Sequence, residues 1–236
     1  MTTTRLLRRV LALMAAALGA AGLAYSAYVA NAWLRYGQTP CPRGDEADPL
    51  LDEFMPEYEV VERHAIRVAA PAAITLAAAA ASDLQRSALV RGIFRVREMI
   101  LGAEPDAGLR PKGLLAETTS LGWRVLADRP GREIVVGAVT QPWHADVVFR
   151  GLSPDEFKTF RGPEYVKIAW TLRADPIGPN ESIFRTETRV MTTDATARRQ
   201  FRWYWARFSP GIVLIRRLLL ENLKDDAERQ MSTSAS

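Results

Sequence analysis

Residues 182–228 read SIFRTETRVMTTDATARRQFRWYWARFSPGIVLIRRLLLENLKDDAE, and they set the architecture of the chain. The first eleven residues predict a β-strand at 182–192, in which the charged residues Arg185, Glu187 and Arg189 share one face and Phe184, Thr186, Thr188 and Val190 share the other. The rest predicts one long amphipathic helix, because apolar side chains recur every three or four positions. These apolar positions are Phe201, Tyr204, Trp205, Phe208, Ile212, Ile215 and Leu219, whereas Arg198, Arg199, Arg202, Arg216, Arg217 and Glu221 take the other side. Pro210 should kink or restart this helix, since proline lacks a backbone N–H.

The elements expected upstream come in an unusual order. A strand is predicted at 57–68, where polar and apolar side chains alternate imperfectly. Pro71 suits the first turn of a helix at 72–83, and a second helix is expected at 87–101, ended by Gly102. Further strands are expected at 122–127, 133–140, 144–150 and 165–174, with a helix start at Ser153-Pro154 between them.

An uncharged apolar run from Val10 to Leu34 follows Arg5, Arg8 and Arg9 near the N-terminus. At about 1.5 Å per residue, a helix of this length spans about 37 Å and exceeds a hydrocarbon core of roughly 30 Å. We therefore expect the segment 10–34 to cross a membrane once. No regular amphipathic pattern interrupts the run, so a buried alanine-rich core helix is a weaker alternative.

The flanks of this run suggest an orientation. Tyr25, Tyr28 and Trp33 gather at its C-terminal end, where aromatic residues favour the membrane interface. The three arginines and the amino group before the run outnumber Arg35 and Arg43 after it, which favours an extracytoplasmic domain. A cleaved signal peptide is the rival interpretation, because Ala30-Asn31-Ala32 has the small-x-small form of a cleavage site.

The expected organisation is an anchor at 1–34, a linker at 35–54, one domain at 55–228 and a flexible tail at 229–236. Prolines and Gly44 spoil regular structure in the linker, which also holds Cys41, the lone cysteine. A net charge of +4 with interspersed acids argues against nucleic-acid binding. A chain rich in alanine and arginine and poor in lysine suggests a bacterial, GC-rich origin.

The order of elements resembles the helix-grip fold of the SRPBCC superfamily, which includes START domains and polyketide cyclase/dehydrase-like proteins. The matching residues are Tyr58-Glu59-Val60-Val61, Pro71-Ala72, Phe184 to Val190, Ala197-Arg198-Arg199, Phe201 and Tyr204-Trp205. The resemblance covers roughly residues 55–228 and implies an α+β fold whose curved antiparallel sheet wraps the long C-terminal helix. It also implies a cavity for a hydrophobic molecule, but no universal catalytic residue.

Elementary packing points the same way, because one helix cannot completely cover the apolar face of a strongly bent sheet. Glu187 and Arg189 could orient a polar ligand head there, or they could form an ion-pair ladder on the solvent side. Arg97 and Glu98 could lie at the cavity mouth or on a solvated helix face. Aromatic candidates for the lining are Trp123, Trp143, Trp170, Tyr204, Trp205 and Phe208, with ordinary core packing as the alternative.

The remaining chemistry is sparse. His64 and His144 have no metal-ligand spacing, and the alternative role for each is that of a surface or satisfied strand histidine. No phosphate-binding glycine loop or nucleophile elbow is present in the sequence, so we expect no cofactor. The sequence favours a membrane-anchored binder of a lipid or other hydrophobic molecule. Its rivals are a cyclase- or dehydratase-like enzyme using Glu187 or Glu98, and an interaction module with a collapsed cavity.

Overall fold

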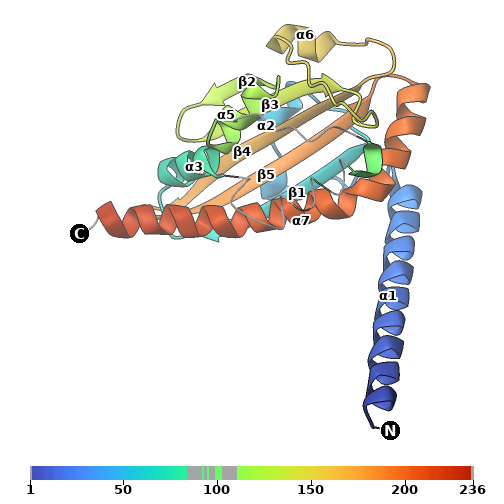
Figure 1. Cartoon of the computed structure of the whole chain (residues 1–236). Helices are drawn as coiled ribbons and strands as arrows, with labels where there is room; N and C mark the ends of the chain where they lie inside the picture. The colour runs from blue at the N-terminus through green and yellow to red at the C-terminus, as the bar shows by residue number, and fades with distance from the viewer. Residues whose placement is uncertain (1, 84–91, 93–94, 96–98, 103–110, 235–236) are drawn as a thin grey trace.

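The computed structural model describes residues 2–83, 92, 95, 99–102 and 111–234 (Figure 1). In chain order the elements are α1 (Thr2–Arg35), the 3-10 turn η1 (Gly44–Glu46), α2 (Pro49–Asp52), β1 (Val60–Val68), α3 (Ala72–Ala81), α5 (Leu114–Ser120), β2 (Arg124–Arg129), β3 (Glu133–Thr140), α6 (Pro154–Thr159), β4 (Val166–Gly178), β5 (Glu181–Thr192) and α7 (Ala195–Ser234). The predicted helix at 87–101 lies largely outside the described residues.

The five strands form one antiparallel sheet in the order β1-β5-β4-β3-β2. With the long C-terminal helix and the apolar N-terminal helix, this sheet confirms the predicted α+β class. The last two strands run further than expected and meet at a turn of only two residues, Pro179 and Asn180. Pairing β5 with β1 brings the start and the end of the domain together.

The strand predicted at 144–150 is wrong. Only one isolated bridge forms in this segment, between Val139 and Arg150. β4 pairs with all of β3, whereas β2 pairs only with residues 133–137, and the bridge to Arg150 forms at Val139, in the part of β3 that β2 leaves free. The helix predicted to start at Ser153 is confirmed as α6, because the Ser153 hydroxyl caps it by accepting from the Glu156 N–H.

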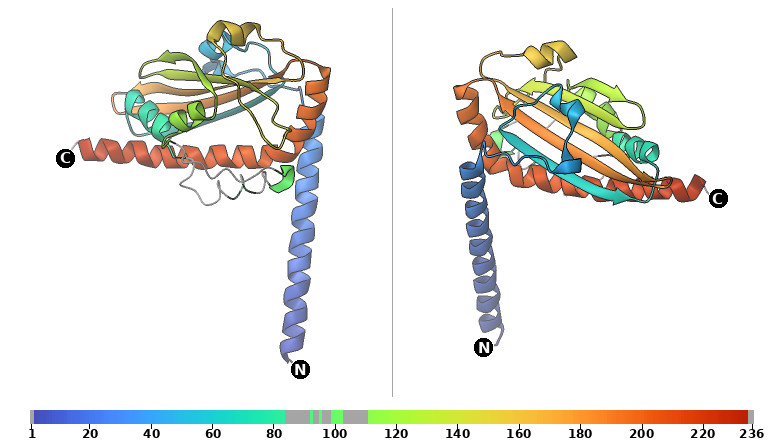
Figure 2. Two further views of the ribbon diagram at one scale, coloured as in Figure 1. Left: turned by 45° about the horizontal axis from the view of Figure 1, so that its top comes forward. Right: turned by 180° about the vertical axis from the view of Figure 1, so that it is seen from behind.

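Side chains alternate between two faces of the sheet, and each face has its own cover. We call them the α7 face, which α3 and α7 cover, and the α2 face, which lies under residues 36–58 (Figure 2). Phe184 and Trp170 lie on the α7 face with Leu220 of α7. Leu51 and Met55 from the α2 segment pack with Val135 on the other face.

The C-terminal helix changes direction along its length. Pro210 lies inside α7, and Figure 1 shows a short first part and a long second part that runs along the sheet. The apolar stripe shifts with this bend. Phe201 is buried as predicted, but beyond Pro210 the buried positions are Leu220, Leu223 and Ala227 rather than those in register with Ile212. The helix continues to Ser234, beyond the end predicted near residue 229.

The segment predicted as a linker, 35–54, lies almost entirely within residues 36–58, which contribute to the cover of the sheet. The Asp48 carboxylate accepts a hydrogen bond from the Leu51 N–H at 2.8 Å, and this contact caps α2. Leu50, Leu51 and Phe54 of this segment are buried. The division of the chain into anchor, linker, domain and tail stays a prediction.

The N-terminal helix α1 leaves the domain as a separate rod (Figures 1 and 2). Its part from Leu7 to Arg35 has a mean hydropathy of 1.8 and is long and apolar enough to cross a membrane. A signal sequence would have the same length and composition. Only its C-terminal turns touch the domain, where the Arg202 guanidinium donates to the Trp33 carbonyl at 2.6 Å.

Candidate functional site

A polar patch interrupts the apolar α7 face near its middle. We call it the polar centre, and it consists of Glu62, His64, Thr186, Thr188 and Arg216. Antiparallel pairing of β1 with β5 sets His64 opposite Thr186 and Glu62 opposite Thr188. The second part of α7 brings Arg216 across them, and its Nη1 donates to the Thr186 hydroxyl at 3.4 Å. Three separate elements therefore converge on one small polar area.

Three atoms of the polar centre are shielded from solvent and have no hydrogen-bond partner among the described residues. They are His64 Nε2, Thr188 Oγ1 and Arg216 Nε. Glu62 Oε2 lies 3.6 Å from His64 Nε2, just beyond hydrogen-bond distance. A buried donor or acceptor left unpaired costs about 1–3 kcal/mol, and more when the group is charged. Such groups in a folded protein usually have a partner, so this concentration calls for a polar atom that the described residues do not supply.

The charges of the polar centre follow from its burial. Burial, together with the positive charges of Arg216 and Arg217, lowers the pKa of His64 to about 4, so its imidazole is neutral at pH 7. Burial raises the pKa of Glu62 above its ordinary value, against the effect of the same two arginines. Burial also lowers the pKa of Arg216 to about 10, which leaves its guanidinium charged at pH 7.

Apolar and aromatic side chains lie on both sides of the polar centre. On the α3 side, the Trp123 and Trp170 rings lie 6.3 Å apart, and both belong to or pack against the core there. On the side of the first part of α7, Phe201 packs with Trp143, Tyr204 and Trp205. The predicted lining residues thus separate into two clusters, and Phe208 stacks at 5.0 Å on Tyr204 at the outer end.

Glu187 and Arg189 lie on the α2 face and not beside these aromatics. Arg189 Nε donates to Glu187 at 2.6 Å, and its Nη1 donates to Asp52 at 2.5 Å. The second oxygen of Glu187 accepts from Arg63 at 2.9 Å. Arg189 is only 1% exposed, so this is a buried network that fastens the α2 segment to the sheet. Neither the ligand-facing nor the solvent-facing orientation considered from the sequence describes it.

Of the other residues considered as site candidates from the sequence, one is exposed and two lie outside the described residues. His144 is exposed, and Arg97 and Glu98 lie outside the described residues. Sequence reasoning missed Arg216, which the predicted stripe placed on the outer side of the helix. The sequence does contain a hint of its orientation, because Arg216 stands four positions before the buried Leu220 and residues four apart share one face of a helix. The bend at Pro210 conceals this relation when a single helical phase is assumed.

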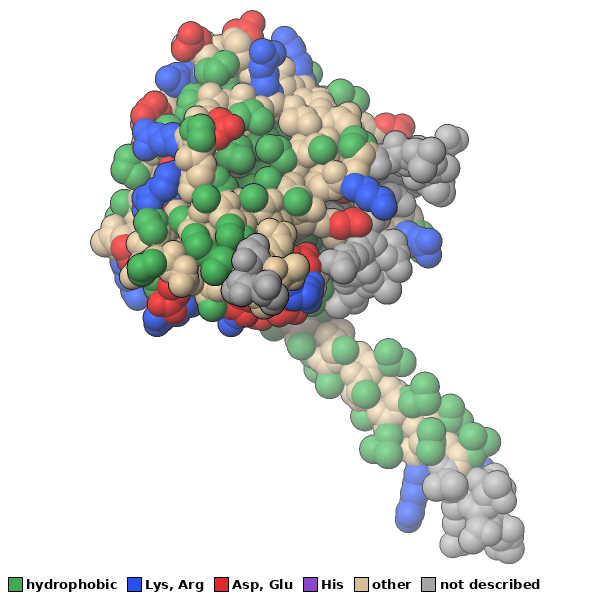
Figure 3. Space-filling model, turned by 90° about the vertical axis from the view of Figure 1, so that its left-hand side faces the viewer, with side chains coloured by type: hydrophobic (Ala, Val, Ile, Leu, Met, Phe, Trp, Pro, Cys, Tyr) green, Lys and Arg blue, Asp and Glu red, His purple; other side chains and the backbone are tan. Residues whose placement is uncertain are grey.

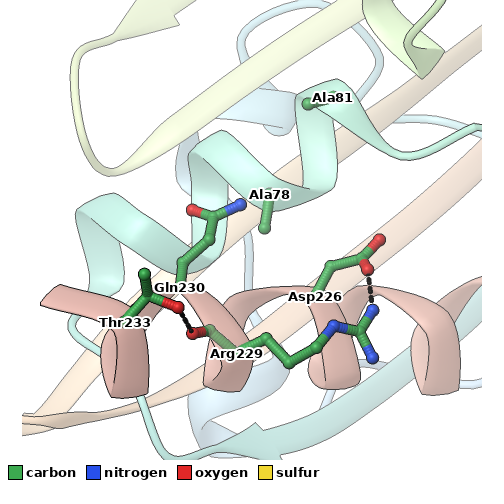
Figure 4. Close-up of a pocket in the computed structure, with 6 residues that line it drawn as sticks. All are labelled: Ala78, Ala81, Asp226, Arg229, Gln230 and Thr233. Atoms are coloured by element: carbon green, nitrogen blue, oxygen red, sulfur yellow. Dashed lines mark hydrogen bonds and ion pairs between the residues drawn. The ribbon is translucent and has the colours of Figure 1, made fainter. Parts of the chain in front are cut away.

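The larger of two hollows lies away from the polar centre, whereas the lining of the smaller one includes His64 and Thr186 of that centre. The larger, of about 590 Å³, is an open groove between α3 and the last turns of α7 (Figure 4). Arg229 and Asp226 form an ion pair there, and the Thr233 hydroxyl donates to the Arg229 carbonyl at 3.0 Å. Figure 3 shows apolar side chains gathered at this end of the molecule, with charged side chains around them. The groove itself has a polar rim and does not match the enclosed apolar cavity that we expected.

The smaller hollow, of about 70 Å³, is lined by Glu46, Arg173 and Arg185, among others. Water occupies about 30 Å³ per molecule in the liquid, so this space holds at most a few waters. Arg173 donates to the Ala47 carbonyl at 2.7 Å, and Arg185 pairs with Asp45. The hollow is therefore part of the junction between the sheet and the α2 segment.

No protein-family model matches the chain, and no curated protein matches it in sequence. Among solved structures, a conserved protein from Geobacillus kaustophilus is 12% identical with a TM-score of 0.30, covering 74% of this chain and 97% of its own. A Deinococcus radiodurans protein is 11% identical with a TM-score of 0.25, covering 61% and 94%. The ZhuI aromatase/cyclase of a Streptomyces species is 12% identical with a TM-score of 0.23, covering 73% and 95%. At such scores the likeness carries no functional conclusion, and the SRPBCC resemblance stays a prediction.

Proposed function

We propose that the chain is a membrane-anchored binder or carrier of an amphipathic molecule. The apolar part of the ligand lies on the α7 face, and its polar head meets the polar centre. One observation carries the proposal: three shielded polar atoms on an otherwise apolar face lack partners among the described residues. A site of this kind, apolar with a few convergent polar groups, is the usual form of a small-molecule site.

The polar centre specifies the chemistry of the head. The Arg216 Nε–H is a donor without an acceptor, and the guanidinium is charged at pH 7. The Thr188 hydroxyl and the neutral His64 imidazole can each donate one further hydrogen bond. A carboxylate or a phosphate oxygen supplies the acceptors that these donors lack, and it also neutralises the charge of Arg216.

The aromatic clusters suit the apolar part of such a ligand. Trp170 and Trp123 offer flat, apolar surfaces on one side of the polar centre. The length and apolar composition of α1 support attachment to a membrane, which would keep the binding face close to a source of lipid. Extracytoplasmic placement of the domain is part of the proposal and rests on the arginines that precede α1.

The test compares two neighbouring arginines in the full chain. Cis-parinaric acid has a carboxylate head and a fluorescent apolar tail, and energy transfer from tryptophan reports binding close to the protein. We expect Arg216→Met to weaken its binding by about 10- to 100-fold, which corresponds to a lost charge-assisted hydrogen bond of about 1.5–3 kcal/mol. Arg217→Met removes an exposed charge that acts on the polar centre only through space, so it should weaken binding much less than Arg216→Met does.

Two control measurements separate a loss of the charge contact from a loss of folding. The uncharged methyl ester of the same probe should bind both variants equally, and the melting temperature of Arg216→Met should not fall. The proposal is wrong if the unaltered chain binds no probe, or if Arg216→Met binds the acid as tightly as Arg217→Met does.

A further inference from the structure

We infer that the domain rests on the membrane surface through the bend of α7, with Leu214, Met99 and Ile100 entering the headgroup layer of an anionic bilayer. This inference depends on the proposed membrane anchor and adds a second membrane contact to it. It fixes how the domain is oriented above the bilayer, which the anchor alone leaves free.

Hydrogen bonds between α1 and α7 set the depth of the bend. The Arg202 guanidinium donates to the Trp33 carbonyl at 2.6 Å, and the Tyr25 hydroxyl donates to the Arg207 carbonyl at 2.9 Å. Tyr25 precedes the last residue of α1 by ten positions, so α7 descends beside α1 by about 15 Å. The Ser209 hydroxyl, next to the helix proline, lies 3.3 Å from the Tyr28 hydroxyl. The bend therefore lies at the level of the α1 tyrosines.

The level of Tyr25 and Tyr28 is a suitable position for the interface between the hydrocarbon core and the headgroups. A hydrocarbon core needs about 20 helical residues, and counting back from Tyr25 reaches residue 5. The spanning part is then shifted toward the N-terminus from the predicted 10–34, and Arg8 and Arg9 lie within its first turns. Tyrosines are enriched at the interface on one side, and arginines can extend to the headgroups on the other. The α7 bend, held against Tyr25 and Tyr28, would then lie among the headgroups.

The direction of α7 beyond the bend agrees with this placement. Figures 1 and 2 show its second part running across the direction of α1, so an upright α1 sets this part parallel to the membrane surface. All three views place the short green helical segment around residue 100 close to the bend and to the end of α1. The side of the domain from which α1 emerges is therefore the side that faces the bilayer.

The exposed side chains on this side suit a lipid surface. Met99 is 80% exposed, Ile100 64% and Leu214 40%, although all three are large and apolar. Arg207 and Arg217 are exposed on the same helix and suit anionic headgroups. Acidic residues begin only at Glu221, further from α1, so the contact is confined to the region near the bend.

Spin labels in vesicles containing anionic lipid test this orientation in the full chain. In a Cys41→Ser background, single labels are placed through Leu214→Cys, through Leu18→Cys in α1, and through Asp155→Cys in α6, on the far side of the domain. We expect labels at positions 214 and 18 to be severalfold less accessible to a water-soluble nickel reagent, and more accessible to oxygen, than the label at position 155.

The two other outcomes overturn the inference in distinguishable ways. If position 18 is shielded by lipid but position 214 is as accessible to nickel as position 155, the anchor stands and the surface contact is wrong. If position 18 is itself accessible to nickel, both the anchor and the contact fall. Binding of cis-parinaric acid is measured separately, so neither outcome depends on the ligand proposal.

Discussion

Individual buried charges have different tasks on the two faces of the sheet. On the α2 face, Arg189 and Glu187 satisfy each other, and Arg63 and Asp52 complete their hydrogen bonds. On the α7 face, Arg216 donates to Thr186 and is attracted by the Glu62 carboxylate, but its Nε–H has no acceptor among the described residues. A satisfied buried network fixes a structure, whereas a buried donor without an acceptor can bind a polar ligand atom. Within the described part of the chain, the α2 face also has one unpaired buried oxygen, Glu133 Oε1, but the α7 face has three unpaired atoms within one small area, and this concentration supports the proposal of a ligand there.

Glu133, on the α2 face, makes the stability of the folded chain depend on pH. Burial, and then the neighbouring Asp48 charge, raises the pKa of Glu133 to about 8. The folded chain therefore holds this proton more tightly than the unfolded chain, whose glutamate pKa is near 4.5. The stability that Glu133 contributes is full below the unfolded value and is lost as pH rises through about 8.

We predict that Glu133→Gln removes this loss of stability at high pH. Glutamine is neutral at every pH, so the variant should be more stable than the unaltered chain at pH 8 by about 1 kcal/mol or more, the cost of an unsatisfied buried group. Urea unfolding at pH 5 and pH 8 measures the effect, and Glu57→Gln at an exposed position is the control. Equal pH dependence in both variants would show that Glu133 does not hold the proton.

Sequence reasoning located some of the binding face and misassigned its polar part. Trp123 and Trp170 could be proposed because many aromatics in one domain suggest a lining. Glu187 stands between two arginines, which suggests either a contact for a polar ligand head or an ion-pair ladder, but alternation along a strand does not show which elements cover each face. His64 and Arg216 meet only through the pairing of β1 with β5 and the bend of α7, which involve contacts between distant parts of the sequence.

Elements with a strong local pattern were predicted well. The strand at 133–140 has the predicted bounds, and α6 starts at its serine cap. The segment 144–150 has a strand-like composition but forms only one bridge, to Val139, and local patterns do not reveal which segments find a pairing partner. The helix α5 lies between the helix predicted at 87–101 and the strand predicted at 122–127, where the sequence predicts no element, because a helix of only seven residues has a weak local pattern.

The joint between α1 and α7 depends on one arginine. The guanidinium of Arg202 donates twice to the Trp33 carbonyl, at 3.0 and 2.6 Å, and its carbon lies 4.1 Å from the Trp33 ring centroid. Carbonyls in the last turn of a helix have no partner within the helix, so Arg202 caps α1 while binding it to α7. This contact should hold the rod and the domain in one relative orientation.

We predict that Arg202→Gln loosens this joint without unfolding the domain. Distances measured by pulsed electron spin resonance between labels at positions 18 and 155 should be narrowly distributed in the parent chain and broad in the variant. Arg199→Gln changes an exposed arginine three positions before Arg202 in the same helix, and it should leave the distance distribution narrow. A distribution that stays narrow in Arg202→Gln would mean that other contacts, such as the Trp33–Trp203 ring pair, suffice.

At the scale of the whole molecule, the sheet separates the α2 face from the α7 face, on which we propose that the ligand binds. Residues 36–58 seal the α2 face with a capped helix and a buried ion network. The α7 face carries the polar centre between two aromatic clusters, and α7 connects that face to the membrane helix. In this arrangement the single helix α7 contacts the ligand, the sheet and the bilayer.

Photocrosslinking with a fatty acid that carries a diazirine in its tail maps the ligand most directly. The full chain in lipid nanodiscs is irradiated, and adducts are assigned to peptides by mass spectrometry. We predict adducts on β4, β5 and the second part of α7, at residues of the α7 face such as Trp170 and Leu220, and their loss in Arg216→Met. Adducts confined to α1, or found on residues 36–58 of the α2 face, would contradict a ligand held against the α7 face.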